Sequence, residues 1–584
     1  MAGSAMPLAM AFGGSAQAFE FTVDNTADGS EGSLRDAVIQ ANDNPGPDTI
    51  VFGSLFDSPQ TINLSSGSLF IDDKVTIEGP GSELLTIDGA EQTDRIFLID
   101  GAEDLGISSM TLTGGRTPDG DPIGGGIFSE DSDLTLTDTV ITGNIADDMP
   151  ADGAEGSGFG GGVALIDGSL TVSDSVISGN SAGQDGDGVT NSVSIGGGIL
   201  AIEAEVLIEN STISENKAIN RGGFFLPAGG GGVSLFDGGN LTIQRSTISG
   251  NIAGNTADNG SEDAYGLGGG VSFVSYYGQL LIVESTISGN VAGNTGTADD
   301  SFGSGGGVFS YGDTVVVNST IAGNIAGSVD NTGSYARGGE LFARDELTVL
   351  SSTIVDNHAI GHGAEGGGIA NLGEETAELH NTIVADNTAD GGPDLFSSPL
   401  GEFNAGYSLV ENQNGATISV IPPGTVLSGP AGLSPLADNG GPTQTHALDA
   451  GDPVFNTGDP GDCLATDQRG ITRPQLGGCD IGAFEFQLPL EGLLEFFDNA
   501  VDEGDLEGKG PGKSARNRLR TFRHWLANAL AQFEGGDVDG ACNSLQSALN
   551  RTDGVAPPPD FVQGDAADDM AAAIAGARTA IGCE

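Results

Sequence analysis

The chain is dominated by a repeated unit of about 35 residues, and this repeat limits its fold more than any other feature. Each unit opens with a glycine run before a β-branched residue and ends with an asparagine. The runs are Gly124–Ile127, Gly160–Val163, Gly196–Ile199, Gly230–Val233, Gly268–Val271, Gly305–Val308 and Gly366–Ile369, with a shorter Gly338-Gly339 in the remaining unit. The asparagines are Asn144, Asn180, Asn216, Asn251, Asn290, Asn324, Asn357 and Asn387.

The residues before each asparagine keep a constant spacing. An isoleucine lies three positions before the first seven asparagines, and a serine or threonine lies two positions before that isoleucine. The isoleucines are Ile141, Ile177, Ile213, Ile248, Ile287, Ile321 and Ile354. In the last unit, Asn381-Thr382-Ile383 precedes Asn387, which indicates one extra residue.

Apolar residues at every second position, such as Leu241 and Ile243 before Asn251, indicate strands with one buried face. A repeated unit of this kind cannot bury its apolar face alone, so it stacks on its neighbours. Stacking places isoleucine over isoleucine in a dry core and asparagine over asparagine in a turn, where side-chain amides can pair. The repeat therefore predicts an all-β parallel solenoid whose structural ladder is formed by these isoleucines and asparagines.

The N-terminal region contains two different signals. Residues 1–18 are uncharged and end in Ala16-Gln17-Ala18, which predicts a secretory signal peptide. Residues 19–59 read as strand, short helix and strand, with Ser33 as the helix N-cap. The elements Gly32-Ser33-Leu34-Arg35 and Asp48–Phe52 resemble the N-terminal cap of secreted right-handed parallel β-helix proteins. This resemblance implies that 19–59 covers the open end of the column.

Residues 60–390 are predicted to form the β-helix repeats. Their glycine runs and their Ser/Ala-Gly-Asn-x-Ala elements resemble the repeats of polymorphic outer-membrane proteins, a family of surface adhesins. The segments that follow Ala182, Ala253, Ala292 and Ala326 are acidic and are predicted to leave the column as loops on one face. Their aspartates suit Ca²⁺, but none matches a known calcium-binding loop, so solvated acidic loops are the favoured interpretation.

Residues 391–486 are predicted to close the column. The stretches Leu433–Leu448, Asp467–Pro474 and Cys479–Glu485 resemble the choice-of-anchor Q domain, which closes β-helix proteins of the same kind. Arg469 and Arg473 are expected to pair with Asp467, Asp480 or Glu485 in a structural role.

A linker is predicted at 487–512 and a helical domain at 513–584, since Leu519, Phe522, Leu526, Leu530 and Phe533 recur at helical spacing. Six cations concentrate at the entry of this domain: Lys509, Lys513, Arg516, Arg518, Arg520 and Arg523. They indicate either docking to an anionic surface polymer or a solvated helix face. Of three possible connectivities, the two local disulfides Cys463–Cys479 and Cys542–Cys583 are the expected pairing.

Composition limits the function. With 82 acidic and 19 basic residues the net charge is −63, which excludes nucleic-acid binding through a basic surface. Such self-repulsion indicates a high-salt (halophilic) habitat or bound divalent cations, with calcium as the candidate cofactor. No segment is long and apolar enough to span a membrane. A secreted or cell-surface location follows, with glycans or envelope polymers as candidate partners.

Enzyme signals are sparse. Gly361-His362-Gly363 resembles one element of the polygalacturonases, but the other elements of that family are missing, so His362 is expected in a loop. A lyase base would have to come from Lys217, Arg221, Arg245 or Arg337. The sequence thus predicts no catalytic residue and no defined metal site. It favours a non-catalytic adhesin or envelope protein, and the alternative is a polysaccharide lyase or glycoside hydrolase.

Overall fold

The computed structural model describes most of the chain. The described residues are 17–89, 94–148, 156–183, 193–219, 228–255, 265–294, 302–328, 335–339, 341–449, 451–475, 478–487, 490–552, 554, 559–564, 566–581 and 583. Residues 1–16 of the predicted signal peptide, most of each predicted acidic loop and Arg221 lie outside these ranges. Those predictions therefore remain predictions.

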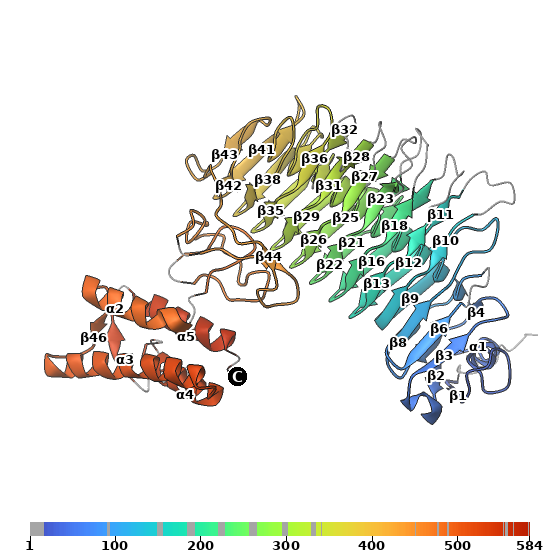
Figure 1. Cartoon of the computed structure of the whole chain (residues 1–584), viewed down its shortest axis with the longest axis horizontal. Coiled ribbons are helices and arrows are strands. Elements are labelled where there is room, and N and C mark those ends of the chain that lie inside the picture. The colour runs from blue at the N-terminus through green and yellow to red at the C-terminus, as the bar shows by residue number, and fades with distance from the viewer. Residues whose placement is uncertain are drawn as a thin grey trace, which may run out of the picture.

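The fold is a right-handed parallel β-helix followed by a small cluster of helices (Figure 1). One sheet has 30 strands, and two further sheets of seven and six strands complete the wall of the column. A single coil illustrates the path: β12 (Val163–Ser173), β13 (Val176–Ser178), β14 (Ser181–Ala182), β15 (Ser194–Ile195) and then β16 (Ile199–Glu209) of the next coil. β12 and β13 belong to the large sheet, β14 to the seven-stranded sheet and β15 to the six-stranded sheet.

The other strands repeat this path with parallel register. The first coils contain β3 (Gln60–Asn63), β4 (Leu69–Ile71), β5 (Val75–Glu78), β6 (Leu85–Asp88), β7 (Phe97–Asp100), β8 (Leu105–Thr113) and β9 (Ile127–Thr142). The large sheet continues with β17 (Thr212–Ser214), β20 (Val233–Phe236), β21 (Leu241–Gln244), β22 (Thr247–Ser249), β25 (Val271–Val283), β26 (Thr286–Ser288), β29 (Val308–Val317), β30 (Thr320–Ala322), β33 (Leu341–Ala343), β34 (Leu347–Leu350), β35 (Thr353–Val355), β37 (Ile369–Asn371), β38 (Thr376–His380) and β39 (Ile383–Ala385).

The two smaller sheets flank the segments where the loops are predicted. The seven-stranded sheet consists of β10 (Ile145–Ala146), β14, β18 (Lys217–Ile219), β23 (Ile252–Asn255), β27 (Val291–Asn294), β31 (Ile325–Ser328) and β36 (His358–Ile360). The six-stranded sheet consists of β11 (Gly158–Phe159), β15, β19 (Ala228–Gly229), β24 (Tyr265–Leu267), β28 (Phe302–Ser304) and β32 (Tyr335–Arg337). In each of six coils the chain passes from a strand of the first sheet to a strand of the second.

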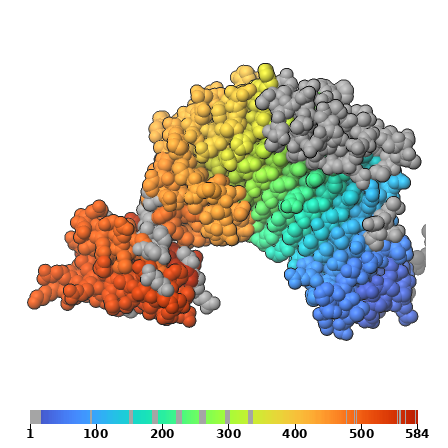
Figure 2. Space-filling view, viewed as in Figure 1, coloured from blue at the N-terminus to red at the C-terminus, as the bar shows by residue number. Residues whose placement is uncertain are grey.

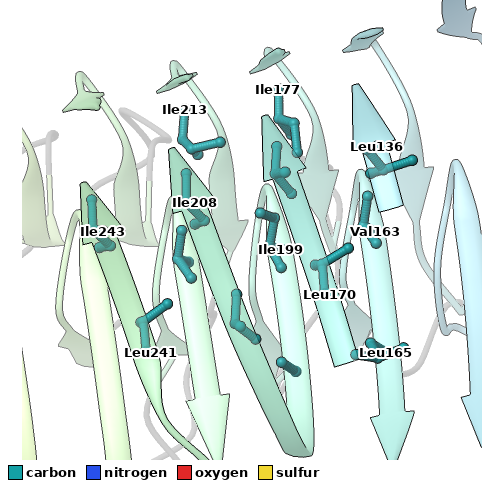
Figure 3. Packing of buried hydrophobic residues seen from close by; sticks show 14 of the residues in the cluster. Leu136, Val163, Leu165, Leu170, Ile177, Ile199, Ile208, Ile213, Leu241 and Ile243 are labelled. Carbon is teal, nitrogen blue, oxygen red and sulfur yellow. The ribbon is translucent and has the colours of Figure 1, made fainter. Parts of the chain in front are cut away.

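The core is a continuous column of aliphatic side chains. Ile177 pairs with Ile141 below it and Ile213 above it, and the same register continues through Ile248, Ile287, Ile321 and Ile354. All seven are fully buried. Figure 3 shows like residues of successive coils side by side, Ile177 beside Ile213 and Ile208 beside Ile243.

The last unit differs from the prediction. The partner of Ile354 is Val384, which lies three residues before Asn387, so the unit carries no extra residue. Ile383 points to the other face, where it packs with Leu409 and Ile481. The Asn-Thr-Ile pattern misled the alignment because the Ile side chain is buried on the outside of the coil.

The N-terminal segment covers the first coil. β1 (Glu20–Val23) pairs with β2 (Asp48–Phe52), and α1 (Leu34–Asn42) lies between them in sequence. The Ser33 hydroxyl accepts a hydrogen bond from the amide of Asp36 at 3.2 Å, as an N-cap residue does. Leu34 and Val38 are buried in the same core cluster as the column.

The column continues past residue 390, where the prediction ended it. β40 (Leu395–Ser397), β41 (Glu402–Gly406), β42 (Leu409–Val410) and β43 (Ile418–Val420) add further parallel strands. Leu395 pairs with Ile369 and Phe403 with Ala377, and both are fully buried. After a two-stranded pairing of β44 (Leu436–Ala437) and β45 (Thr445–His446), the chain lies along the flank of the column (Figure 2).

The C-terminal residues form a separate hydrophobic core. It contains α2 (Leu493–Glu503), α3 (Lys513–Glu534), α4 (Val538–Leu549) and α5 (Ala567–Ala580), with β46 (Glu507–Gly508) antiparallel to β47 (Val562–Gln563). The predicted linker contains α2 and β46 and is part of the helical cluster. Leu493 and Phe497 of α2 belong to the core of this cluster, where the Phe497 ring stacks on Phe522 of α3. The disulfides are Cys463–Cys479 and Cys542–Cys583, which confirms the expected pairing.

Candidate functional site

The asparagines form a buried ladder along the column. The Oδ1 atom of Asn216 accepts hydrogen bonds from the amide and from Nδ2 of Asn180, each at 3.0 Å. Its own Nδ2 donates to Oδ1 of Asn251 at 3.0 Å and back to the carbonyl of Ile177 at 2.9 Å. Because both oxygen lone pairs and both N–H groups are used, burial of this amide leaves nothing unsatisfied.

The glycine runs and the asparagine ladder depend on each other, which sequence reasoning missed. A Cβ on Gly198 would lie 2.7 Å from the carbonyl oxygen of Gly232 and 3.0 Å from Nδ2 of Asn216. The third glycine of each run thus leaves the space that the asparagine amide fills. The first glycine, Gly196, has a φ of +68° and turns the chain into the long strand.

A second ladder runs through the serines that precede the isoleucines. The hydroxyl of Ser211 accepts from the amide of Ser175 at 3.0 Å and donates to the carbonyl of Glu209 at 2.7 Å. The amide of Ser211 in turn donates to the hydroxyl of Ser246 at 3.0 Å. This geometry explains why the sequence places only serine or threonine at that position.

Asp394 ends the asparagine ladder. Its Oδ1 accepts from Nδ2 of Asn387 at 3.0 Å, and its Oδ2 accepts from the amide of Asn412 at 2.7 Å. A carboxylate has no hydrogen-bond donor of its own. It therefore accepts from the last asparagine amide and needs no partner in a further coil. Burial raises the pKa of Asp394 to about 6, although these hydrogen bonds lower it.

The segment on the flank is held by buried ion pairs. Arg469 lies 2.6 Å from Asp467, and Arg473 lies 3.3 Å from Glu485, as expected from the sequence. The Arg469 guanidinium also stacks 3.5 Å from the centre of the Phe484 ring. Burial and the nearby charge of Asp480 together raise the pKa of Glu485 to about 8, although Arg473 lowers it.

The same segment contacts outward-facing threonines of the column. Thr286 donates to the carbonyl of Gln444 at 2.6 Å, and Thr320 donates to Oε1 of Gln468 at 2.6 Å. Thr353 accepts from the amide of Ala483 at 3.0 Å. These contacts give the cluster around Arg473 a structural role.

Two exposed tyrosines of one coil lie near a half-buried tyrosine, an exposed arginine and an exposed leucine of later coils. Tyr276 is 76% exposed and Tyr277 is 99% exposed, at a bend within β25. One coil further, Tyr311 accepts a 3.1 Å hydrogen bond from Arg344, whose guanidinium lies 5.0 Å from the Tyr311 ring centre. Leu400, two coils beyond Arg344, is 69% exposed. We call these five residues the Tyr–Arg surface.

A shallow hollow of about 700 Å³ continues this surface from Arg344 to Leu400. It crosses three coils, and Asp345, Glu374 and Glu375 line it with carboxylates. With coils spaced as strands are, at about 4.8 Å, the surface from Tyr277 to Leu400 spans about 19 Å. The signal in the sequence was the Tyr276-Tyr277 pair followed by Tyr311 and Arg344 at repeat spacing, in a chain with 6% aromatic residues.

A second hollow, of about 770 Å³, contains three carboxylates, Asp386, Asp394 and Glu411. Burial raises the pKa of Asp386, and the charges of Glu411 and Asp356 raise it further. Neither lysine nor arginine is among the residues that line this hollow.

The structure does not bring the predicted lyase bases together. Lys217 lies on β18 beside a shallow hollow that also contains Glu215. Arg245 pairs with Glu209 at 3.5 Å, and Arg337, on β32, pairs with Glu365 at 3.2 Å. Neither Arg245 nor Arg337 is among the described residues that line the hollow at Lys217.

His362 is exposed on the turn between β36 and β37. Among the described residues, no group of three or more His, Cys, Asp or Glu side chains is placed to hold a metal ion. Within those same ranges, none of the helices combines the length and the apolar character needed to span a bilayer.

Comparisons with known proteins add little. No family model and no curated protein matches the chain, so the resemblances to the choice-of-anchor Q domain and to polymorphic outer-membrane protein repeats stay predictions. Among solved structures, the A-module of the mannuronan C-5 epimerase AlgE6 of Azotobacter vinelandii is 15% identical, with a TM-score of 0.30 over 69% of this chain and 97% of that one. ORF18 of Geobacillus virus E2 is 8% identical, with a TM-score of 0.22 over 66% of this chain and 61% of that one. Neither likeness bears on function.

Proposed function

We propose that this chain is a non-catalytic adhesin or envelope protein of the cell exterior, in which the β-helix holds a glycan-binding surface. The observation that carries the proposal is the Tyr–Arg surface, where two exposed tyrosines, Tyr276 and Tyr277, lie two coils from Arg344 and the hollow that begins there. Tyrosine and arginine supply most of the energy in many binding surfaces, and an exposed group of them marks a contact site. The two disulfides fit an extracellular location.

The chemistry of the hollow favours a neutral polysaccharide chain. Its shape is long and shallow, which suits a linear polymer. Its carboxylates, Asp345, Glu374 and Glu375, can accept hydrogen bonds from sugar hydroxyls, and the tyrosine rings can stack on the apolar faces of sugars. An acidic polymer would be repelled there, since Arg344 is the only cation among the described residues that line the hollow.

A glycan array with the full chain tests this proposal, with and without Ca²⁺. Tyr276→Ser combined with Tyr277→Ser is expected to weaken binding of a neutral glycan by about tenfold to a hundredfold. The control is Phe70→Ser, which removes a 41% exposed aromatic ring from β4, far from the Tyr–Arg surface in sequence. Equal binding by the double variant and the control variant would refute the assignment.

A second candidate function is hydrolysis or elimination of a polysaccharide. The hollow with Asp386, Asp394 and Glu411 favours it, because carboxyl groups with raised pKa values cluster at catalytic sites. The absence of lysine and arginine from its lining, and the role of Asp394 in the ladder, weigh against it. Turnover of a bound glycan that Glu411→Gln abolishes would establish the enzyme and overturn the adhesin.

A further inference from the structure

The C-terminal helices carry a concentrated positive charge. Six of the 19 lysines and arginines lie between residues 509 and 523, and this stretch contains neither aspartate nor glutamate. The rest of the chain is strongly acidic, with a net charge of −63 overall. Five of these six cations lie on α3, so this helix is locally basic in an otherwise acidic protein.

Three of the six cations already have partners. Arg523 pairs with Asp498 of α2 at 2.6 Å, and Lys509 lies 3.5 Å from Asp560. Arg518 donates to the carbonyl of Lys509 at 2.6 Å. These contacts tie α3 to its neighbours and are internal to the helical cluster.

The other three cations lie free on one side of α3. Lys513, Arg516 and Arg520 are exposed, and in the part of the chain that the structure describes their side chains form no ion pair and no hydrogen bond. Their spacing of three and four residues places them on one helix face over about 10 Å. We call these three residues the basic stripe. The core residues Phe522 and Leu526 of the same helix are on the opposite side, packed against α2 and its neighbours.

We propose that the basic stripe docks the protein on an acidic polysaccharide of the cell envelope. The charges are complementary, because a linear polyanion presents a row of carboxylates to a row of unpaired cations. Arginine guanidinium groups bind carboxylates through two parallel N–H···O bonds, which a solvated lysine cannot do. The site is distinct from the Tyr–Arg surface, so this inference rests on the proposed function only for the location outside the cell.

The geometry disfavours a membrane as the anionic occupant. A membrane surface would be recognised by cations beside exposed apolar groups, but Phe522 and Leu526 are buried and Trp525 stacks on Phe561 inside the cluster. The acidic column of a second copy is the other anionic occupant, and the self-association measurement below distinguishes it from the polymer.

The test uses the full chain and polygalacturonate as the probe, measured by biolayer interferometry at low and high NaCl. The triple variant Lys513→Gln, Arg516→Gln and Arg520→Gln is expected to bind about tenfold more weakly, and added salt should weaken binding of the unaltered chain. The control variant Lys74→Gln, Lys217→Gln and Arg337→Gln removes the same number of cations from the column and should bind normally.

Three outcomes would overturn the inference. Equal loss in both variants would mean that net charge alone governs binding. Capture by anionic phospholipid vesicles without capture by polygalacturonate would replace the polymer by a membrane. Self-association of the unaltered chain in sedimentation without polymer, lost in the triple variant, would make the acidic column of another copy the occupant. The Tyr276 and Tyr277 variants should not change polygalacturonate binding, which separates this test from that of the proposed function.

Discussion

The β-helix column and the C-terminal helical cluster are stabilised in different ways. In the column each coil repeats the contacts of its neighbour. Nδ2 of Asn216 donates to Asn251 and to the carbonyl of Ile177, and one coil further Nδ2 of Asn251 donates to the equivalent Asn290 and Ile213. In the helical cluster every contact is unique, and a disulfide joins Cys542 to Cys583 across 41 residues. The column therefore resembles other repeat proteins, whose stability is a sum over neighbouring units, whereas the cluster must fold as one unit.

The comparison also concerns charge. Most polar side chains buried in the column are neutral amides and hydroxyls, with Asp48, Asp147 and Asp394 as buried carboxyl groups among them, and most of its other carboxylates lie outside. The cluster exposes the basic stripe instead. This difference indicates that the aliphatic core and the repeated asparagine and serine ladders can stabilise a strongly acidic column without an ion pair on each coil.

The largest effect is expected from breaking the ladder. Asn216→Ala leaves the amide and Nδ2 of Asn180 and the carbonyl of Ile177 without their partner, and these groups are buried. We expect a loss of about 4 kcal/mol in the free energy of unfolding of the column, measured by chemical denaturation. Asn240→Ala, an exposed asparagine, should cost less than about 1 kcal/mol. A similar loss in both variants would contradict the role of the ladder.

The next effect concerns the cluster alone. Replacing Cys542 and Cys583 by alanine releases a 41-residue loop, which should destabilise the cluster by about 2–4 kcal/mol. Calorimetry should show the transition of the helices at a lower temperature while that of the column stays in place. A common shift of both transitions would mean that the two regions unfold together.

A smaller effect should depend on pH in the flank segment. The pKa of Glu485 is raised to about 8 and that of Asp480 to about 6, from ordinary values of 4.5 and 3.8. The folded segment therefore binds protons that the unfolded chain has released. The contribution of these two carboxyl groups to stability is greatest below about pH 4 and is lost as the pH rises to about 8, by about 2 kcal/mol between pH 6 and pH 8.

The amide of Gln475 donates to Oε1 of Glu485, and the amide of Phe486 donates to Oδ2 of Asp480, so hydrogen exchange at these two amides measures this dependence. After correction for intrinsic exchange, protection should fall from pH 6 to pH 8. Glu485→Gln cannot lose a proton and should flatten that part of the curve. Protection that stays constant over this range in the unaltered chain would show that Glu485 is already ionised when folded.

The smallest effect is expected at the surface of the cluster. Arg523 and Asp498 form a 2.6 Å pair, but their side chains are 50% and 43% exposed. Arg523→Ala should change the stability of the cluster by no more than about 0.5 kcal/mol, and a double-mutant cycle with Asp498→Ala isolates the pair. A coupling energy above about 1 kcal/mol would contradict this prediction and show that the ion pair contributes substantially to the stability of the cluster.

The sequence predicted the column well because periodic side chains report directly on stacking. The isoleucine register, the cap around Ser33 and the ion pairs of Arg469 and Arg473 were all expected. The error at Ile383 arose because a residue type was matched instead of a facing direction. Helix α2 was missed because Leu493 and Phe497 form too short a pattern to indicate a helix by themselves.

The rest could not be predicted because it depends on contacts distant in sequence. Thr286 and Gln444 lie 158 residues apart, and no local pattern reports that they touch. The Tyr–Arg surface forms only when the bends of several coils are superposed. Its members are separated in sequence and show no local pattern. The pairing of β25 with β29, in which Val274 lies beside Tyr311, places the bend with Tyr276 and Tyr277 next to the bend of the following coil.

The way in which Asp394 replaces the next asparagine has a consequence for evolution. Each rung accepts from the coil before it, so units can be duplicated or deleted anywhere between Asn144 and Asn387 without altering either terminus. Every added unit would lengthen the molecule by about 4.8 Å. The length of the column can thus be changed by recombination of units alone, because the single carboxylate of Asp394 ends the ladder after any number of coils.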